Sequence, residues 1–201
     1  MKKVFFLSAA LLGLLLFTAF KKDDLKEAGL YKVDHSKSGV TWEGKKVIGG
    51  HNGTIQIKEG SVNYNGQTIS SGTFTIDMST IKSLDLEGAS KEKLEHHLMS
   101  PDFFDVAKYP LTTFKIKKVE KRKDDQAWVT CSLTIKETTR EISFPITVSA
   151  ANGRLEVTAK NIKVDRTKYG VQMASKTLKS SMGEKAINDE FTIGFSLVLV
   201  R

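Results

Sequence analysis

The sequence has almost no cysteine: Cys131 is the only one among 201 residues. A single cysteine excludes an internal disulfide. Cys131 lies on the apolar face of an alternating segment, which indicates a small buried thiol rather than a nucleophile. The chain also lacks internal repeats and low-complexity tracts. We therefore expect one domain of about 175 residues after the N-terminal segment.

Patterns typical of catalytic sites are missing as well. Ser100 lies near His97 and Asp102, but no Gly-x-Ser-x-Gly elbow surrounds a serine. No strand-like segment carries the paired inward carboxylates that glycosidases need. Adjacent residues such as His96 and His97 point about 100° apart on a helix, whereas metal-binding helices place two histidines four residues apart. These absences favour a protein that is not an enzyme and holds no metal.

Two other functions stay open at this stage. One is a secreted metal-dependent or hydrolytic enzyme that uses the segment with His96, His97, Asp102 and Asp105. The other is an envelope interaction module that binds no ligand.

The net charge of +8 comes mostly from scattered lysines. Their alternate placement in strand-like segments is typical of a solvated sheet face. The stretch from Lys115 to Lys123 is denser and favours contact with an anionic surface, such as a membrane. No basic helix and no aromatic-basic module is present, which excludes nucleic acid as a partner.

An apolar run from Val4 to Phe20 follows a basic start. This pattern predicts a signal peptide over residues 1–20 and secretion of the protein, followed by a charged linker over residues 21–30. The run is slightly short for a spanning helix, which needs about 20 residues. Because Phe20 makes a poor cleavage site, an uncleaved membrane anchor is the alternative.

From Tyr31 onward the dominant period is two, which is typical of strands with one buried face. Alternating segments occupy residues 40–42, 55–57, 74–78, 114–116, 129–135, 142–148, 155–159 and 191–199. Turn residues separate them, with a type I′ turn predicted at Asn65-Gly66 and another turn at Ser70–Gly72. Eight or more antiparallel strands indicate an all-β sandwich or a closed barrel, and closure would remove exposed strand edges.

Residues 90–99 break this pattern and predict a helix. Ser90 is placed to cap it, Leu94 and Leu98 share a face, and Pro101 ends it. We expect one histidine of the adjacent pair to pack under the helix and the other to meet solvent. A second break, residues 177–188, predicts an irregular loop.

The expected inward faces are rich in aromatic residues: Trp42, Phe74, Phe114, Phe144, Phe191 and Phe195. An eight-stranded barrel can hold one small ligand. Strands of about ten residues span roughly 33 Å, a tunnel length that suits an extended lipid tail. A fully packed core without a cavity is the alternative. Arg166 is expected to pair with Asp165, Asp102 or Asp105, or to contact a ligand's polar head.

The segment after the expected helix carries a resemblance to a known family. It reads Leu94-x-x-His97-Leu98-x-Ser100-Pro101-Asp102-Phe103-Phe104-Asp105-Val106-x-Lys108-Tyr109-Pro110. This resembles the central signature of the YceI family of bacterial polyisoprenoid-binding proteins. The same family is matched by Gly72-x-Phe74-x-Ile76-Asp77-Met78, Leu133-Thr134-Ile135 and Asp165-Arg166-Thr167-x-Tyr169-Gly170-Val171. Glu137 departs from it, since the family commonly has glycine there, and predicts a wider hairpin.

The resemblance implies that residues 31–201 form an eight-stranded antiparallel, extended lipocalin-like barrel with a short helical insertion near residues 90–108. It implies a non-catalytic periplasmic protein that carries a long isoprenoid or similar amphiphilic lipid in its pore. No cofactor is expected other than such a polyisoprenoid or quinone-like lipid. The family also suggests that two barrels pair as a homodimer.

We expect the lipid chain to be bound by inward apolar side chains of the barrel. These are Val40, Trp42, Ile55, Ile57, Phe74, Ile76, Phe114, Phe144 and Phe195, together with Phe103 and Phe104 near the helical end. His97 or Arg166 is expected to contact the polar head.

Overall fold

The computed structural model describes residues 27–178, 183–184 and 186–201. The predicted signal peptide, most of the predicted linker and part of the predicted loop at 177–188 lie outside these residues. The first strand begins at Gly29, inside the range predicted as linker. In the part of the chain that is described, no helix is long and apolar enough to cross a membrane.

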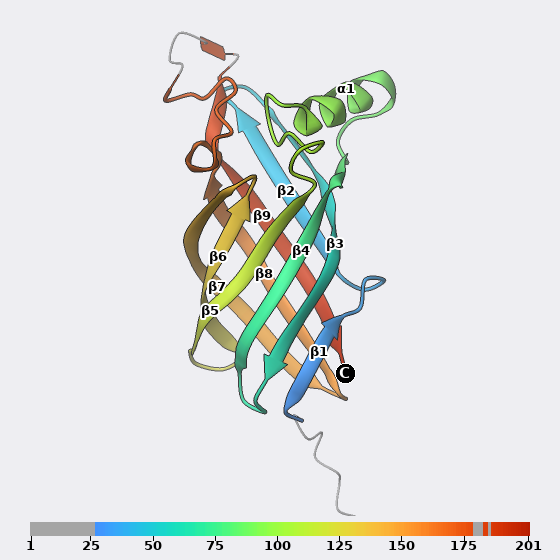
Figure 1. Cartoon of the computed structure of the whole chain (residues 1–201), viewed down its shortest axis with the longest axis vertical. Helices are drawn as coiled ribbons and strands as arrows, with labels where there is room; N and C mark the ends of the chain where they lie inside the picture. Colours follow the sequence, from blue (N-terminus) through green and yellow to red (C-terminus); the bar gives the residue numbers. More distant parts are fainter. Residues whose placement is uncertain (1–26, 179–182, 185) are drawn as a thin grey trace, which may run out of the picture.

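Long antiparallel strands make up most of the fold (Figure 1). In chain order the elements are β1 (Gly29–Val33), β2 (Gly39–Lys46), β3 (Gly50–Tyr64), β4 (Ile69–Ser83), α1 (Gly88–Met99), β5 (Leu111–Lys121), β6 (Gln126–Ile135), β7 (Thr138–Ala151), β8 (Arg154–Asp165), the 3-10 helix η1 (Arg166–Tyr169) and β9 (Ile187–Val200). Strands β3 to β9 pair in sequence order from β3 through β4 to β9, and β9 pairs with β2, which pairs back with β3. The sheet is therefore a closed barrel.

Two short strands share one place in this barrel. Tyr31 of β1 pairs with Val62 towards the end of β3. Val40 of β2 pairs with Ile55 of β3 on one side and Phe195 of β9 on the other. Because β1 and β2 both lie between β3 and β9, the strands fill eight positions, and the predicted eight-stranded antiparallel barrel is confirmed.

The period-two pattern places apolar side chains inside the barrel. Along β6 every second residue is buried, from Ala127 through Cys131 to Ile135. Cys131 is fully buried, which confirms the prediction of a buried thiol. Burial raises the pKa of its thiol to about 12, so the thiol stays protonated and unreactive.

The predicted turns are partly wrong in detail. A type I′ turn needs positive φ at both central residues. At Asn65-Gly66 only Gly66 has positive φ, and the Asn65 side chain instead accepts a hydrogen bond of 2.8 Å from the Thr68 backbone N–H. The φ values expected for type I′ occur at Asn152 and Gly153, +52° and +70°, in the β7–β8 hairpin.

Two further turn predictions are corrected by the register. Residues 70–72 lie inside β4, where Ser71 pairs with Asn63 and Gly72 with Val62, because β3 and β4 are longer than the periodicity indicated. The β6–β7 hairpin is not widened. Residues 135 and 138 are paired, and Lys136 takes the left-handed conformation (φ +55°) that a tight connection needs.

Helix α1 lies at one end of the barrel, confirming the helical insertion. Its N-cap is Glu87 rather than Ser90, because the chain already turns into the helix at Gly88, which has a φ of +52°. The buried carboxylate of Glu95 accepts hydrogen bonds from the Ser83 backbone N–H (2.9 Å) and Lys82 Nζ (3.0 Å). These bonds fix α1 to the end of β4.

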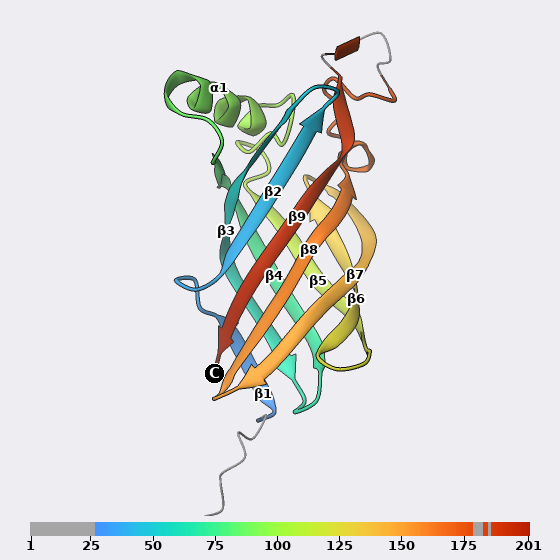
Figure 2. The ribbon, with the colours of Figure 1, turned by 180° about the vertical axis from the view of Figure 1, so that it is seen from behind.

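We call this end of the barrel the α1 end. It also carries the β2–β3 hairpin and the described residues between η1 and β9, as both ribbon views show (Figures 1 and 2).

Candidate functional site

A cavity of about 410 Å³ lies inside the barrel towards the α1 end. This volume is within the range of small-molecule sites, roughly 300–1,000 Å³. Ten of the eleven residues predicted to bind a lipid chain line it: Val40, Trp42, Ile55, Ile57, Phe74, Ile76, Phe103, Phe104, Phe114 and Phe195. The fully packed core that was the alternative is therefore wrong. That these residues bind a lipid stays a prediction.

Phe144 is the residue of this set that does not line the cavity. Its ring packs against those of Phe114 and Phe195, with centroids 5.7 and 6.2 Å apart. Phe144 therefore packs against two phenylalanine rings that line the cavity without lining it itself. Inward alternation identifies buried residues, but it does not tell which of them border empty space.

The cavity does not run the length of the barrel as the expected tunnel would. At the end opposite α1, Tyr31 and Tyr64 are buried and meet edge to face, with ring centroids 6.1 Å apart. Fully buried Ile69, Leu155 and Leu199 fill the interior there. The site is therefore a blind pocket that is closed at the end of the barrel opposite α1.

Several lining residues were missed by the sequence analysis. Some extend the predicted faces, such as Met78 and Thr112, whereas Met173 and Ala174 come from the segment after η1. That segment has no period-two signal, so nothing in its pattern indicated an inward position.

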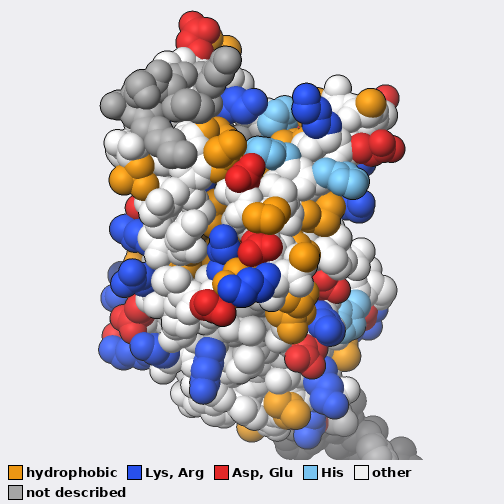
Figure 3. All heavy atoms as spheres, turned by 45° about the horizontal axis from the view of Figure 1, so that its top comes forward, with side chains coloured by type: hydrophobic (Ala, Val, Ile, Leu, Met, Phe, Trp, Pro, Cys, Tyr) orange, Lys and Arg blue, Asp and Glu red, His pale blue; other side chains and the backbone are white. Residues whose placement is uncertain are grey.

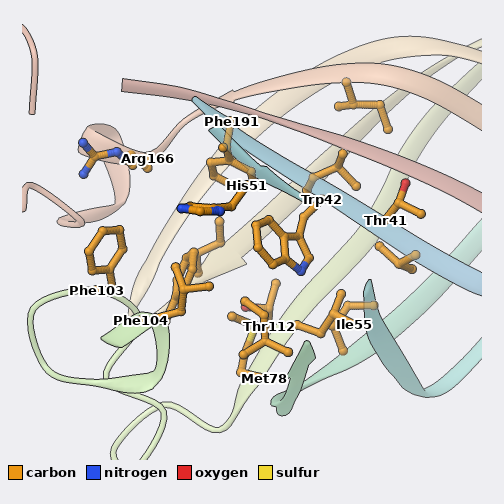
Figure 4. Close-up of a pocket in the computed structure, with 18 of the residues that line it drawn as sticks. Thr41, Trp42, His51, Ile55, Met78, Phe103, Phe104, Thr112, Arg166 and Phe191 are labelled. Atoms are coloured by element: carbon orange, nitrogen blue, oxygen red, sulfur yellow. The ribbon is translucent and has the colours of Figure 1, made fainter. Parts of the chain in front are cut away.

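An aromatic cluster lies where the chain leaves α1 (Figure 4). The His97 and Phe103 rings meet at 4.9 Å, and Phe104 lies 6.4 Å from Phe103 and from Phe191. His97 lines the cavity whereas His96 is exposed, which confirms the expected division of the histidine pair. Both predicted phenylalanines therefore form the wall at the α1 end.

Trp42 is held in the cavity wall by its backbone neighbours. Its indole Nε1 donates a 3.2 Å hydrogen bond to the Thr54 carbonyl. The cross-strand partner is Gly53, where an added Cβ would lie 2.6 Å from the indole. Glycine at that position leaves room both for the indole and for the Lys82 carbonyl, which an added Cβ would approach even more closely.

Arg166 is buried at the α1 end, and its partners differ from those predicted. Its guanidinium donates to the carbonyls of Val171 (2.8 Å), Asn188 (3.1 Å) and Ile187 (3.2 Å). The nearest acid is Asp189, with an N–O distance of 3.9 Å. The expected pairing with residue 165, 102 or 105 is wrong, because η1 turns the side chain towards the start of β9.

Arg166 nevertheless borders the cavity. Its guanidinium lies 5.8 Å from the Phe103 ring centroid. Burial lowers the pKa of this group, and the nearby carboxylates oppose the shift. Three of its five N–H groups are used by the carbonyls, and Nη2 also faces the Asp189 carboxylate at 3.9 Å.

His51 and Asp85 form a pair that the sequence analysis missed. His51 lines the cavity, and its Nδ1 lies 2.8 Å from Asp85 Oδ2. Asp85 Oδ1 also accepts from the Asn52 backbone N–H (3.1 Å) and Ser83 Oγ (2.9 Å). The two residues meet because the start of β3 lies beside the end of β4, where Gly53 pairs with Ser83.

The carboxylate of this pair predicts a pH dependence of stability. Burial alone would raise the pKa of Asp85, but hydrogen bonds from His51, Asn52 and Ser83 outweigh it and hold the pKa at about 2, below the ordinary 3.8. A lowered folded-state pKa stabilises the protein above pH 4, and this stabilisation is lost as the pH falls towards 2. Asp85→Asn should therefore cost about 1 kcal/mol at pH 6, after allowance for solvent screening, and almost nothing at pH 2.

Urea unfolding at a series of pH values measures this difference. Asp124→Asn, on the exposed β5–β6 loop, is the matched control. An Asp85→Asn penalty that stays constant from pH 6 to 2 would contradict the assignment.

Within the described ranges, no group of three or more His, Cys, Asp or Glu side chains is placed to hold a metal ion. Asp102 and Asp105, the acids of the enzyme alternative, are not among the cavity-lining residues. The chemistry that this site offers is apolar contact along its walls and a few polar groups at one end.

Comparisons with known proteins agree with this geometry. The family model described as YceI-like domain matches residues 31–199. Among solved structures, BcnA of Burkholderia cenocepacia superposes with a TM-score of 0.64 at 22% identity, covering 83% of this chain and 98% of BcnA. A polyisoprenoid binding domain of Saccharophagus degradans, implicated in plant cell wall breakdown, gives 0.62 at 14% identity, covering 85% and 97%.

The YCEI protein of Campylobacter jejuni gives a TM-score of 0.52 at 14% identity, covering 98% of this chain and 91% of its own. At these identities the solved structures establish the fold. No curated protein matches the sequence.

Proposed function

We propose, from the premise that this chain belongs to the YceI-like domain family, that it is a non-catalytic carrier enclosing the isoprenoid or similar amphiphilic chain of a lipid. The observation that carries this proposal is the blind cavity with aromatic and aliphatic walls. The polyisoprenoid binding domain of Saccharophagus degradans, which shares the fold, supports the same class of ligand.

The physical basis is apolar burial. Each methylene group moved from water into such a cavity contributes about 0.8 kcal/mol, so a few isoprene units outweigh the cost of ordering the chain. The packed end of the barrel, where Tyr31 and Tyr64 are buried, limits how far the chain reaches in this proposal. A longer lipid therefore leaves its remainder outside the α1 end.

The polar head of the ligand belongs at the α1 end in this proposal. His97 and Arg166 border the cavity there, and so does His51, with Nδ1 held by Asp85. When Nδ1 donates to the carboxylate, Nε2 is the nitrogen left to accept a hydrogen bond from a ligand hydroxyl. The packed opposite end offers no comparable group among the residues that line the cavity.

We place the protein in the periplasm. The basic start and apolar run of residues 1–20 support export, and a lipid carrier is useful where an amphiphile must cross an aqueous compartment.

Lipid extraction from the purified protein followed by mass spectrometry tests the function. We expect a long-chain isoprenoid or related amphiphile at a near-stoichiometric ratio, and uptake of prenyl alcohols by delipidated protein. A protein that carries no amphiphile and takes up none would contradict the proposal. Metal analysis of the same sample examines the enzyme alternative.

A further inference from the structure

The tip of the β2–β3 hairpin exposes two apolar side chains to solvent. Val47 is 50% and Ile48 68% exposed, whereas most large apolar side chains of the described chain are buried. Both are preceded by exposed lysines, Lys45 and Lys46. Exposing two neighbouring apolar side chains to water is unfavourable in free energy. Apolar residues next to lysines suit the boundary between the head groups and the acyl chains of a membrane.

A second segment completes this surface. The Val47 backbone N–H donates a 3.3 Å hydrogen bond to the Ala186 carbonyl, so the hairpin tip lies against the segment between η1 and β9. That segment exposes Leu178 (57%) and Lys176. We call the five residues Lys45 to Ile48 and Leu178 the mouth rim. Figure 3 brings the α1 end forward and shows hydrophobic side chains at its surface among cationic, acidic and histidine side chains.

The mouth rim adjoins the cavity. Lys45 and Lys46 line it, as do Ala174 and Ile187, the neighbours of the rim's second segment. A lipid that enters or leaves at the α1 end therefore passes next to the exposed apolar tip.

We propose that the mouth rim docks on the surface of an anionic lipid bilayer. Val47, Ile48 and Leu178 enter the boundary between head groups and acyl chains, and the rim lysines contact anionic head groups. The cavity opening then faces the bilayer, and a lipid chain moves between bilayer and barrel without crossing water. The inference rests on the proposed function for its cargo but concerns a different surface.

A bilayer fits this surface better than a protein partner. A stable protein interface buries about 800 Å² on each side, which a rim with three exposed apolar side chains does not offer. The other basic region, Lys115 to Lys123, is less suited. Ion pairs occur in both regions, such as Lys45 with Glu43 at 3.2 Å and Lys117 with Glu141 at 2.9 Å, but residues 115–123 do not line the cavity and lie towards the end of the barrel opposite α1 (Figure 1).

Vesicle co-sedimentation tests the proposal with the full exported chain. The probes are phosphatidylcholine vesicles with and without phosphatidylglycerol. The variants are Val47→Ser/Ile48→Ser and, as a matched control at the opposite end of the barrel, Lys121→Gln/Lys123→Gln. Because the tip residues are exposed, the serine variant should fold normally, which its circular dichroism and unfolding midpoint check.

We expect the wild type to bind anionic vesicles, the tip variant to bind at least about tenfold more weakly, and the control variant to bind like the wild type. Farnesol added in solution should bind the tip variant and the wild type equally, because the tip does not reach into the cavity. Transfer of a prenyl probe from vesicles should slow in the tip variant alone.

Equal vesicle binding by the tip variant, or a loss in the control as large as that in the tip variant, overturns the docking proposal. So does a vesicle-free dimer that the tip variant abolishes, since the rim would then bind a second copy of the chain. A wild type that docks on vesicles and takes up no farnesol supports docking and counts against the lipid-carrier function instead.

Discussion

Replacing Ile76 by tryptophan is expected to abolish binding of a prenyl chain while leaving the barrel folded. Ile76 lies on β4 between Ile57 and Thr112, its neighbours on β3 and β5, and its side chain borders the cavity. The larger indole would extend into empty space, so the overpacking cost that a filled core imposes is mostly avoided. We expect affinity to fall at least about 100-fold, because the indole occupies the volume that the chain needs.

A matched substitution in the packed half of the barrel should behave in the opposite way. Ile146 on β7 is 4% exposed and does not line the cavity, so Ile146→Trp should destabilise the barrel by about 1–3 kcal/mol. Prenyl binding measured by quenching of tryptophan fluorescence, together with urea unfolding, separates the two effects. If Ile76→Trp costs as much stability as Ile146→Trp, the cavity is not available space, and a ligand-free module becomes the better explanation.

Replacing Arg166 by methionine is expected to destabilise the protein by about 3–5 kcal/mol. Three buried or half-buried carbonyls would lose their donor, and the Asp189 carboxylate would lose its cation. Each unsatisfied group costs its desolvation penalty. Arg166→Lys should recover only part of this loss, because one ammonium group does not reproduce the planar fork that reaches three acceptors.

Urea unfolding of the ligand-free protein measures the effect. The control is Lys168→Met, in the same 3-10 helix, whose ammonium is 3.6 Å from Asp165 but largely exposed and should matter by less than about 0.5 kcal/mol. A role limited to the ligand head group predicts otherwise: unchanged stability of the Arg166→Met protein without ligand and a loss of affinity alone.

The barrel could be predicted because its signal is local. Alternation along segments such as 129–135 reports the buried face of a strand whatever its partners are. The same inward faces supplied the cavity wall, since the side chains of Phe74 and Phe114 point inward from paired positions. The length of the cavity could not be predicted, because it depends on how the buried side chains at the end opposite α1 pack together, among them Tyr31 and Tyr64 on the paired strands β1 and β3.

The polar contacts of the site could not be predicted from the sequence for a different reason. His51 meets Asp85, and Arg166 meets Asp189, only when the strand registers are known. Glu95 carries no sign in the sequence that it is buried, since only the position of β4 supplies its two donors. Sequence periodicity specifies faces, whereas these pairs depend on the relative shift of separate strands.

The barrel is closed by contacts between its first and last strands. β9, the last strand, pairs with β1 and β2, the first two, as in Val40 with Phe195. These contacts join residues far apart in the sequence, so the contact order is high and folding is expected to be slow. Until β9 arrives, the edges of β2 and β8 are unpaired and prone to pair with other chains. A chain without β9 therefore has no sealed interior, and the cavity exists only once the final strand has paired.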